Sequence, residues 1–376
     1  MPVFTAIEIL DGGEAIALSR ADGEKVRFHD IWLRDNAPDP ETRSTGNGQK
    51  LIKLADIPEN ISIREASLEG EQVMLRFSPE DKQVSFDQQW LLKHRYDNRK
   101  SASRLQTWDA SLQDTVPTGH FQDLALHSDA LQKWLHDIDR LGFAKMTGGV
   151  AQSHALFDVI DLFGYVRETN YGRCFEVRTE VDPTNLAYTG LGLQAHTDNP
   201  YRDPVPTLQL LYCIENTVEG GDSLLVDGFR VAERMRAEKP DYFSMLSAFN
   251  ARFCYEGEAG VSLRSERPMI ELNPNGDVIA VRFNNRSCAS LVDIPYEKMQ
   301  AYYAAYRYFA ALVDDPEMAI SFKLAPGEGF LVDNTRILHA RTAYSGTGNR
   351  WFQGCYADKD GLLSTLASLE NKGIAG

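Results

Sequence analysis

Leu208-Gln209-Leu210-Leu211-Tyr212-Cys213-Ile214 is the apolar run that decides the fold class. It is far too short to span a bilayer, and its length suits a buried strand. Similar short runs, separated by Gly, Pro and Asn turns, lie at residues 186–189, 223–227, 278–283, 318–324, 329–332 and 351–356. Many short strands with this punctuation are typical of two-sheet β folds, so we predict a jelly-roll core.

Helical periodicity occurs beside these strands. Ser128 and Asp129 are N-cap candidates, and Gly142 ends a pattern that places Leu131, Trp134, Leu135, Ile138 and Leu141 on one face. Further helices are predicted from Ser153 and over residues 229–247 and 295–313. We therefore expect an α+β, mainly β fold with helices flanking the core.

The predicted domains differ in composition. Residues 1–100 alternate short β-like runs with Gly, Asp, Asn and Pro, which predicts a small β-rich N-terminal domain. Residues 101–120 are polar with weak periodicity, and we expect a linker there. The catalytic domain is then expected over residues 121–376.

Charge and cysteine usage restrict the classes of partner and compartment. The chain has 39 basic and 54 acidic residues, a net charge of −15 that would repel nucleic acid. Its five cysteines are scattered without a Cys-x-x-Cys pair, as in proteins of a reducing compartment. The N-terminus has no basic region followed by an apolar core. We expect a cytoplasmic protein that binds neither membrane nor nucleic acid.

His196-Thr197-Asp198 is a candidate metal motif, because residues two apart on a strand point to one face. The spacing alone is weak, since His127-Ser128-Asp129 repeats it at a predicted helix start, where Ser and Asp are explained as caps. His339, at the end of a later strand, supplies a second imidazole. Two His and one carboxylate form a facial triad, which leaves iron positions open for a cosubstrate and oxygen.

Arg350 follows His339 across the turn at residues 345–349, so we expect it on the next strand, facing the metal. A guanidinium there can bind a distal carboxylate in bidentate fashion. Arg341 is an alternative, because it shares strand parity with His339.

Longer strings carry a resemblance to a known family. They are Ile31-Trp32-Leu33-Arg34-Asp35-Asn36, Asn185-Leu186-Ala187-Tyr188-Thr189, His196-Thr197-Asp198, Gly220-Gly221-Asp222-Ser223, Val226-Asp227-Gly228-Phe229, Phe283-Asn284-Asn285 and Gly354-Cys355-Tyr356-Ala357-Asp358. Over nearly its whole length the chain resembles the γ-butyrobetaine and trimethyllysine dioxygenases of the taurine-dioxygenase-like superfamily. The resemblance implies a double-stranded β-helix, Fe(II) on His196, Asp198 and His339, and 2-oxoglutarate and O2 as cosubstrates. It also implies a homodimer.

The same resemblance implies the substrate contacts. Positions matching an aromatic cage for a trimethylammonium group are Tyr171, Phe175, Tyr188 and Tyr356. Asn185 and Asn284 match positions at the anion end of the substrate. Two departures from the butyrobetaine enzymes concern that end, because Asn199 replaces an aromatic residue and Arg286 replaces a small one.

These departures favour a substrate with more anionic oxygens than a carboxylate has. Arg282, Asn284 and Arg286 share strand parity, so Arg282 is a further candidate donor. Extra donors suit a three-oxygen dianion, and the hypothesis is a small zwitterion, 2-(trimethylamino)ethylphosphonate, hydroxylated at C1 beside phosphorus. A family member with that substrate is known.

The small domain also departs from the family. The butyrobetaine enzymes bind zinc there through cysteines and a histidine, whereas this chain reads Asn36-Ala37-Pro38-Asp39-Pro40-Glu41-Thr42 and has Lys82 at the histidine position. We therefore expect no structural zinc.

Two alternatives to the phosphonate hypothesis remain open. In one, the chain hydroxylates γ-butyrobetaine and forms carnitine. In the other, a jelly-roll protein binds a quaternary ammonium compound without turnover. The triad together with Arg350 argues against the binding protein, because such a protein has no use for an open iron face.

Overall fold

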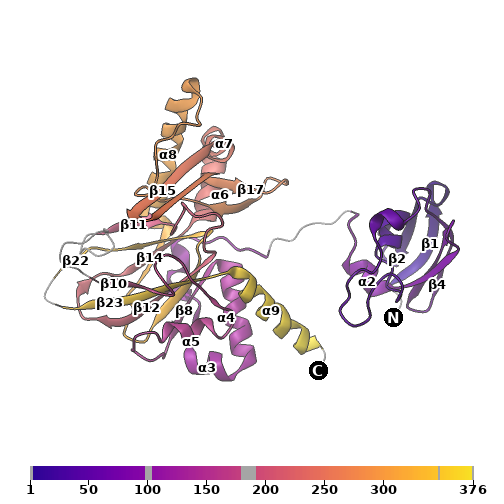
Figure 1. Ribbon diagram of the computed structural model, residues 1–376, viewed down its shortest axis with the longest axis horizontal. Helices are drawn as coiled ribbons and strands as arrows, with labels where there is room; N and C mark the ends of the chain where they lie inside the picture. Colours follow the sequence, from indigo (N-terminus) through magenta and orange to yellow (C-terminus); the bar gives the residue numbers. More distant parts are fainter. Residues whose placement is uncertain (1–2, 98–103, 179–191, 346–347, 375–376) are drawn as a thin grey trace. The chain divides into compact units, whose positions relative to one another are not determined.

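The computed structural model describes residues 3–97, 104–178, 192–345 and 348–374 (Figure 1). It divides into two compact units, Met1–Ala102 and Ser103–Gly376. Each unit has its own apolar core, and each is described separately below.

The N-terminal unit consists of two three-stranded antiparallel sheets and two short helices. One sheet has the order β1-β2-β3 and the other β4-β5-β6. Along β5 the side chains of Val73, Leu75 and Phe77 are buried, while the residues between them are partly exposed, as expected for strands that cover a core with one face. The elements are β1 (Phe4–Leu10), β2 (Ala15–Arg20), β3 (Lys25–His29), α1 (Asp30–Asp35), β4 (Ser62–Glu69), β5 (Gln72–Ser78), β6 (Lys82–Asp87) and α2 (Gln88–Lys93).

The second unit contains two facing sheets, which confirms the predicted jelly-roll core. The larger sheet has the order β10-β23-β12-β20-β8-β7, with β9 paired to β23, and the smaller has the order β11-β21-β14-β19. The larger sheet comprises β7 (Thr118–His120), β8 (Phe143–Thr147), β9 (Val166–Arg167), β10 (Phe175–Arg178), β12 (Leu208–Asn216), β20 (Gly329–Asp333) and β23 (Arg350–Ala357). The smaller comprises β11 (Leu193–His196), β14 (Ser223–Asp227), β19 (Ala319–Phe322) and β21 (Ile337–Arg341).

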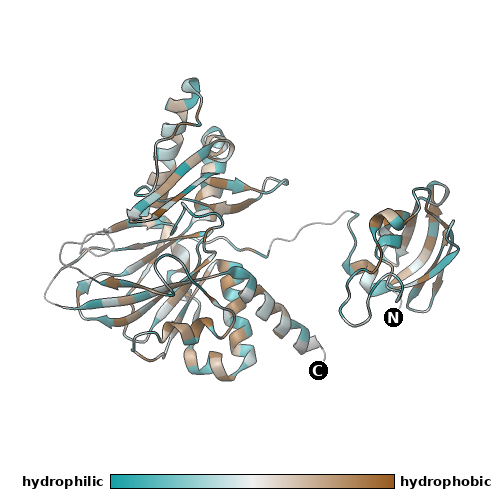
Figure 2. Cartoon of the chain, viewed as in Figure 1, coloured by the Kyte–Doolittle hydropathy of each residue, from teal (hydrophilic) through white to brown (hydrophobic). Residues whose placement is uncertain are grey.

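This unit has four layers, helices, the larger sheet, the smaller sheet and helices, and apolar side chains pack between them. Between the sheets, Phe143, Phe330 and Phe352 of the larger sheet pack with Leu225 and Ile320 of the smaller one. The outer face of the larger sheet is covered by α4 (Ser128–Leu141), α5 (Leu156–Ile160) and α9 (Lys359–Ile374). The outer face of the smaller sheet packs against α6 (Gly228–Glu238), α7 (Pro240–Ala248) and α8 (Met299–Val313). In Figure 2 these helices carry both apolar and polar residues, as expected of helices that bury one face.

Four helical predictions can be compared with the structure. The helix ending at Gly142 is confirmed as α4, and Gly142 adopts φ 83° at its C-terminus. The helix predicted from Ser153 is the shorter α5, and residues 295–313 form a 3-10 turn followed by α8. The single helix predicted over residues 229–247 is wrong: Pro240 begins a second helix, because it cannot donate a backbone hydrogen bond to α6.

Most predicted strands are present, but one hairpin was not predicted. The strand predicted at 186–189 lies outside the described residues. The hairpin of β15 (Asn250–Glu258) and β16 (Val261–Pro268) has charged residues along much of its length, so no apolar run marks it. A small sheet of β17 (Ile270–Leu272) and β18 (Val278–Val281) follows it. Within the described residues, no helix is both long and apolar enough to cross a membrane.

The expected linker at residues 101–120 differs from the structure, because the chain is bonded to the catalytic unit from Gln106 onward. Trp108 is buried between the sheets, and its backbone N–H donates to Asp227 Oδ2 at 3.1 Å. The carbonyl of Gln106 accepts a hydrogen bond from Arg336 Nη2 at 2.6 Å. The segment is held by individual hydrogen bonds and one buried ring, so its sequence has no regular alternation of apolar and polar residues. For this reason the sequence suggested a linker.

Candidate active site

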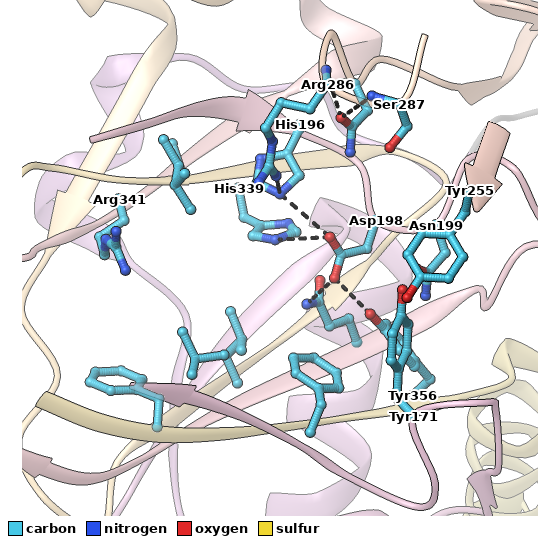
Figure 3. Close-up of a pocket in the computed structure, with 18 of the residues that line it drawn as sticks. Tyr171, His196, Asp198, Asn199, Tyr255, Arg286, Ser287, His339, Arg341 and Tyr356 are labelled. Carbon is cyan, nitrogen blue, oxygen red and sulfur yellow. Dashed lines mark hydrogen bonds and ion pairs between the residues drawn. The ribbon is translucent and has the colours of Figure 1, made fainter. Parts of the chain in front are cut away.

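His196, Asp198 and His339 converge at one end of the smaller sheet (Figure 3). Strands β11 and β21 are antiparallel neighbours, and His196 pairs directly with His339 in their register. Asp198 lies just beyond the end of β11. The potential ligand atoms of the three side chains all lie within 4.8 Å of one another.

The donor atoms suit a divalent iron ion. His196 Nδ1 bonds to the carbonyl of Gln194 at 2.8 Å, which leaves Nε2 as the ligand nitrogen. Nε2 of His196 and Nε2 of His339 lie 3.4 and 3.8 Å from Asp198 Oδ1. Two imidazoles and one carboxylate are the donor set of a facial triad, and they fit iron(II) better than a four-ligand structural zinc site.

Electrostatics keep these groups in the forms that bind metal. Burial alone would raise the pKa of Asp198, but the hydrogen bond with His196 and the charges of both histidines hold this pKa well below its usual range. Burial, followed by the charge of His196, lowers the pKa of His339 to about 3. An ionised carboxylate and a neutral imidazole are the ligand forms.

The second oxygen of Asp198 is oriented by two neighbours. Gln209 Nε2 on β12 donates to Asp198 Oδ2 at 2.7 Å, and the Tyr356 hydroxyl on β23 donates to it at 2.8 Å. These bonds leave Oδ1 facing the two histidines. Tyr356, expected only as a cage residue, therefore also orients a metal ligand.

The triad opens into a cavity of about 420 Å³. Both arginines considered for 2-oxoglutarate line this cavity and are buried. Arg350 Cζ lies 3.9 Å from the centre of the Phe352 ring, and Arg350 Nε and Nη1 have no hydrogen-bond partner among the described residues. Burial and the charge of Arg341 lower the pKa of Arg350 to about 10. A buried guanidinium with unused donors is suited to binding a carboxylate.

Tyr171, Tyr255 and Tyr356 lie on the other side of Asp198 from Arg341 (Figure 3). Tyr171, Phe175 and Tyr356 line the cavity as expected, and Tyr201 and Tyr255, which were not predicted, line it with them. The rings of Tyr201 and Tyr255 stack at 5.1 Å, and those of Phe175 and Tyr356 lie 5.1 Å apart. Two expected residues, Tyr188 and Asn185, lie outside the described residues.

The candidate anion-binding residues differ in how many of their side-chain atoms already have hydrogen-bond partners in the protein. Arg286 is exposed where it lines the cavity, and its Nη2 lies 2.8 Å from His196 Nε2. Asn199 is buried, its Oδ1 accepts from the Tyr201 hydroxyl at 2.6 Å, and its Nδ2 has no partner among the described residues. Asn284 also lines the cavity, but its Nδ2 donates to the Thr197 carbonyl and its Oδ1 accepts from the backbone of Arg286.

The prediction for Arg282 is wrong, because its side chain does not line this cavity. Its Nε donates to Glu271 Oε1 at 2.8 Å, and its Nη1 donates to two backbone carbonyls. Strand β18 ends at Val281, so strand parity does not relate Arg282 to Arg286.

Gln209, Tyr201, Tyr255 and Ser287 line the cavity and were not predicted from the sequence. Only Gln209 could have been noticed in the sequence, because it is a polar residue within the apolar run at residues 208–214. Tyr201 and Tyr255 carried no signal that separates a cavity tyrosine from a core one.

Comparisons with known proteins agree with this geometry. Residues 102–356 match the model of the taurine catabolism dioxygenase TauD, TfdA family, and residues 7–92 match the N-terminal domain of γ-butyrobetaine hydroxylase-like proteins. The chain belongs to the TauD, TfdA family of dioxygenases. It is 32% identical to human γ-butyrobetaine dioxygenase over 97% of both chains, and 31% identical to that of Pseudomonas sp. strain AK-1 over 98% of this chain and 96% of the relative. It is 28% identical to chicken mitochondrial trimethyllysine dioxygenase over 95% of this chain and 86% of the relative.

The TauD-family assignment establishes the class of chemistry. The protein is an iron(II) and 2-oxoglutarate dependent dioxygenase. His196, Asp198 and His339 form a cluster that could hold its iron ion. The hypothesis of a binding protein without turnover is therefore wrong. When bound, iron and 2-oxoglutarate supply the oxidative decarboxylation that activates O2 for hydroxylation, while the side chains described above bind and orient the reactants.

Proposed function

We propose that this dioxygenase hydroxylates a small zwitterion with a trimethylammonium group at one end and a phosphonate at the other, 2-(trimethylamino)ethylphosphonate. The observation that carries the proposal is the composition of the cavity beside the triad. It combines a tyrosine-rich wall with hydrogen-bond donors of Arg286, Ser287 and Asn199.

The tyrosine-rich wall supports a cation that has no N–H donors. Tyr171, Tyr201 and Tyr255 line the cavity, and their side chains contact one another. The Arg202 guanidinium lies 5.8 and 6.0 Å from the ring centres of Tyr171 and Tyr201, so these rings already accommodate a cation. A trimethylammonium ion is attracted to ring faces by the ring quadrupole, by about 0.5–2 kcal/mol for each well-placed ring.

The donors support an anion with three oxygens. The Asn199 Nδ2 and the Arg286 guanidinium can each approach a different oxygen, and the hydroxyl of Ser287 lines the same cavity. A phosphonate dianion offers more charge and one more oxygen than a carboxylate, so it uses this donor set more fully.

γ-Butyrobetaine is the second candidate, favoured by the relatives that are 31–32% identical over almost the whole chain. A carboxylate can also bind Arg286. The two candidates share the trimethylammonium group, and they differ in the anion and by one methylene in the chain that joins the two ends. Hydroxylation of γ-butyrobetaine would make the protein a carnitine-forming enzyme.

A substrate comparison tests the proposal. Succinate and hydroxylated product are measured with each zwitterion separately and in direct competition, with the wild-type enzyme and Arg286→Gln. We expect a higher kcat/KM for the phosphonate, and we expect Arg286→Gln to lower this kcat/KM about 10-fold or more, because a charge-assisted hydrogen bond contributes about 1.5–3 kcal/mol. The kcat/KM for γ-butyrobetaine should fall less, because its carboxylate has less charge and one oxygen fewer. A clear preference for γ-butyrobetaine would refute the phosphonate assignment, and absence of product from both would refute the substrate class.

A further inference from the structure

The side chain of Asn334 makes hydrogen bonds to both backbone groups of the candidate iron ligand Asp198. Strand β11 ends at His196, so no sheet hydrogen bonds hold Asp198 in place. Instead, the Asp198 N–H donates to Asn334 Oδ1 at 2.7 Å, and Asn334 Nδ2 donates to the Asp198 carbonyl at 2.9 Å. The Asn334 side chain is only 2% exposed, so water does not compete for these bonds.

The same residue also holds the far end of the loop that follows Asp198. Asn334 Nδ2 makes a second bond to the Pro206 carbonyl at 2.9 Å, and the Asn334 backbone N–H donates to the Thr207 carbonyl at 2.9 Å. The loop between these attachments carries Asn199 and Tyr201, two residues that line the cavity. One side chain thus connects the two ends of this loop.

Asn334 is placed for this task by its own segment. It lies in the turn between β20 and β21, and β21 carries His339. The turn is held by Asp333, whose Oδ1 accepts from the backbone and hydroxyl of Thr335 and whose Oδ2 accepts from Lys359 Nζ at 2.6 Å. A displacement of Asp198 relative to His339 would therefore have to break bonds to Asn334.

We propose that Asn334 is a positioning residue that sets Asp198 at the correct distance from His339 for metal binding. An asparagine side chain meets the requirement because one oxygen accepts while two N–H groups donate. Aspartate keeps the shape but has no donor for the two carbonyls. Alanine removes all three side-chain bonds.

The neighbouring Thr197 indicates that loss of Asn334 would loosen Asp198 without unfolding the segment. The Thr197 N–H donates to the Phe283 carbonyl at 2.8 Å, and its Oγ1 accepts from the Phe283 N–H at 3.1 Å. His196 is likewise held by its register with β21. The effect of a substitution should therefore concentrate on Asp198.

Metal binding by the full-length apoprotein tests the proposal without any substrate. The affinities of wild type, Asn334→Asp and Asn334→Ala for Co(II) are measured by calorimetry, and the visible absorption of bound Co(II) reports the ligand geometry. Substitution of groups that orient metal ligands costs about 10–100-fold in affinity, and we expect losses of this size with an altered spectrum.

Gln88→Ala is the matched control. Gln88 is also a buried amide that clamps backbone groups, because its Oε1 accepts from Val3 and Phe4 and its Nε2 donates to the Gly70 carbonyl at 3.0 Å. Gln88 lies in the N-terminal unit. The substitution Gln88→Ala should lower thermal stability without changing Co(II) affinity. Unchanged Co(II) affinity and spectrum in Asn334→Ala would overturn the proposal. Loss of folded protein in both Asn334 variants would also overturn it, because that result would assign Asn334 to the core.

Discussion

The hydroxyl of Tyr356 donates a hydrogen bond of 2.8 Å to Asp198 Oδ2, while Asp198 Oδ1 faces both histidines of the iron site. One tyrosine therefore links the aromatic wall of the cavity to the metal. Burial and the charge of Asp198 raise the pKa of Tyr356 above its usual value, so the hydroxyl stays protonated and can donate.

Tyr356→Phe keeps the ring but removes this donor. We expect iron(II) affinity to fall about 10-fold or more, because groups that orient a metal ligand typically contribute that much. The KM for the substrate should change less, since the ring remains. Iron titration of the apoprotein measures the first effect and steady-state kinetics the second. Tyr212→Phe serves as the control, because the Tyr212 hydroxyl donates to the Val150 carbonyl on the outer side of the larger sheet. Equal iron affinities in both variants would contradict the role given to Tyr356.

Arg350→Met tests the assignment of Arg350 to 2-oxoglutarate binding. The buried Nε and Nη1 of Arg350 have no hydrogen-bond partner among the described residues, so a carboxylate would complete their bonding. We expect the KM for 2-oxoglutarate to rise about 10–100-fold, corresponding to about 1.5–3 kcal/mol. Arg341→Met shows whether the second arginine contributes, and Arg230→Met, at a partly exposed pair with Asp109, is the control. A larger effect in Arg341→Met than in Arg350→Met would transfer the role to Arg341.

The iron site could be predicted because its residues depend on local geometry. His196 and Asp198 are close in the chain, and His339 was expected at the end of a later strand, although no apolar run was assigned to residues 337–341. The distance between His196 and His339 in space follows from the pairing of β11 with β21, which is a property of the jelly-roll fold rather than of either segment. The family resemblance implied the fold and the three ligands, but it did not give this pairing.

The substrate end was harder to predict because strand parity holds only within a strand. Arg282 and Arg286 belong to one alternating pattern in the sequence, yet β18 ends at Val281 and the backbone then leaves the sheet. Tyr255 lies on a hairpin without an apolar run. Asn334 has the composition of an ordinary turn residue, and its contacts to Asp198 depend on the tertiary fold alone.

Breaking the buried ion pair of Arg336 with Asp227 should strongly destabilise the catalytic unit. Both side chains are almost fully buried, and the guanidinium also bonds to the carbonyls of Arg140 and Gln106. Arg336→Met leaves Asp227 charged and unpaired, and we expect a loss of about 3–5 kcal/mol in the free energy of unfolding. Arg234→Met breaks the more exposed pair with Asp315 and should cost about 0–1 kcal/mol. Urea unfolding of both variants measures the difference, and equal losses would show that burial of the Arg336 pair does not matter.

In the N-terminal unit, Lys82 binds two acidic side chains, Asp39 and Glu41. Lys82 Nζ lies 2.9 Å from Asp39 Oδ1 and 2.7 Å from Glu41 Oε2. We expect Lys82→Met to lower the free energy of unfolding by about 1 kcal/mol. Lys25→Met, at an exposed pair with Glu8, should have almost no effect. We also propose that the unit binds no structural zinc, so a chelator should leave its unfolding unchanged, and a large loss of stability with a chelator would contradict this.

The pH dependence provides a second test of the Lys82 cluster. Burial alone would raise the pKa of Asp39, but hydrogen bonds from Lys82 and Thr42 lower it below its usual value of 3.8. A carboxylate whose folded-state pKa is lowered stabilises the fold above the unfolded-state pKa, and this contribution is lost as the pH falls through the folded-state pKa. The difference in unfolding free energy between wild type and Lys82→Met should therefore be full at pH 7 and shrink below about pH 4. A difference that stays constant down to pH 2 would show that Lys82 acts through packing of its alkyl chain rather than through the charge of Asp39.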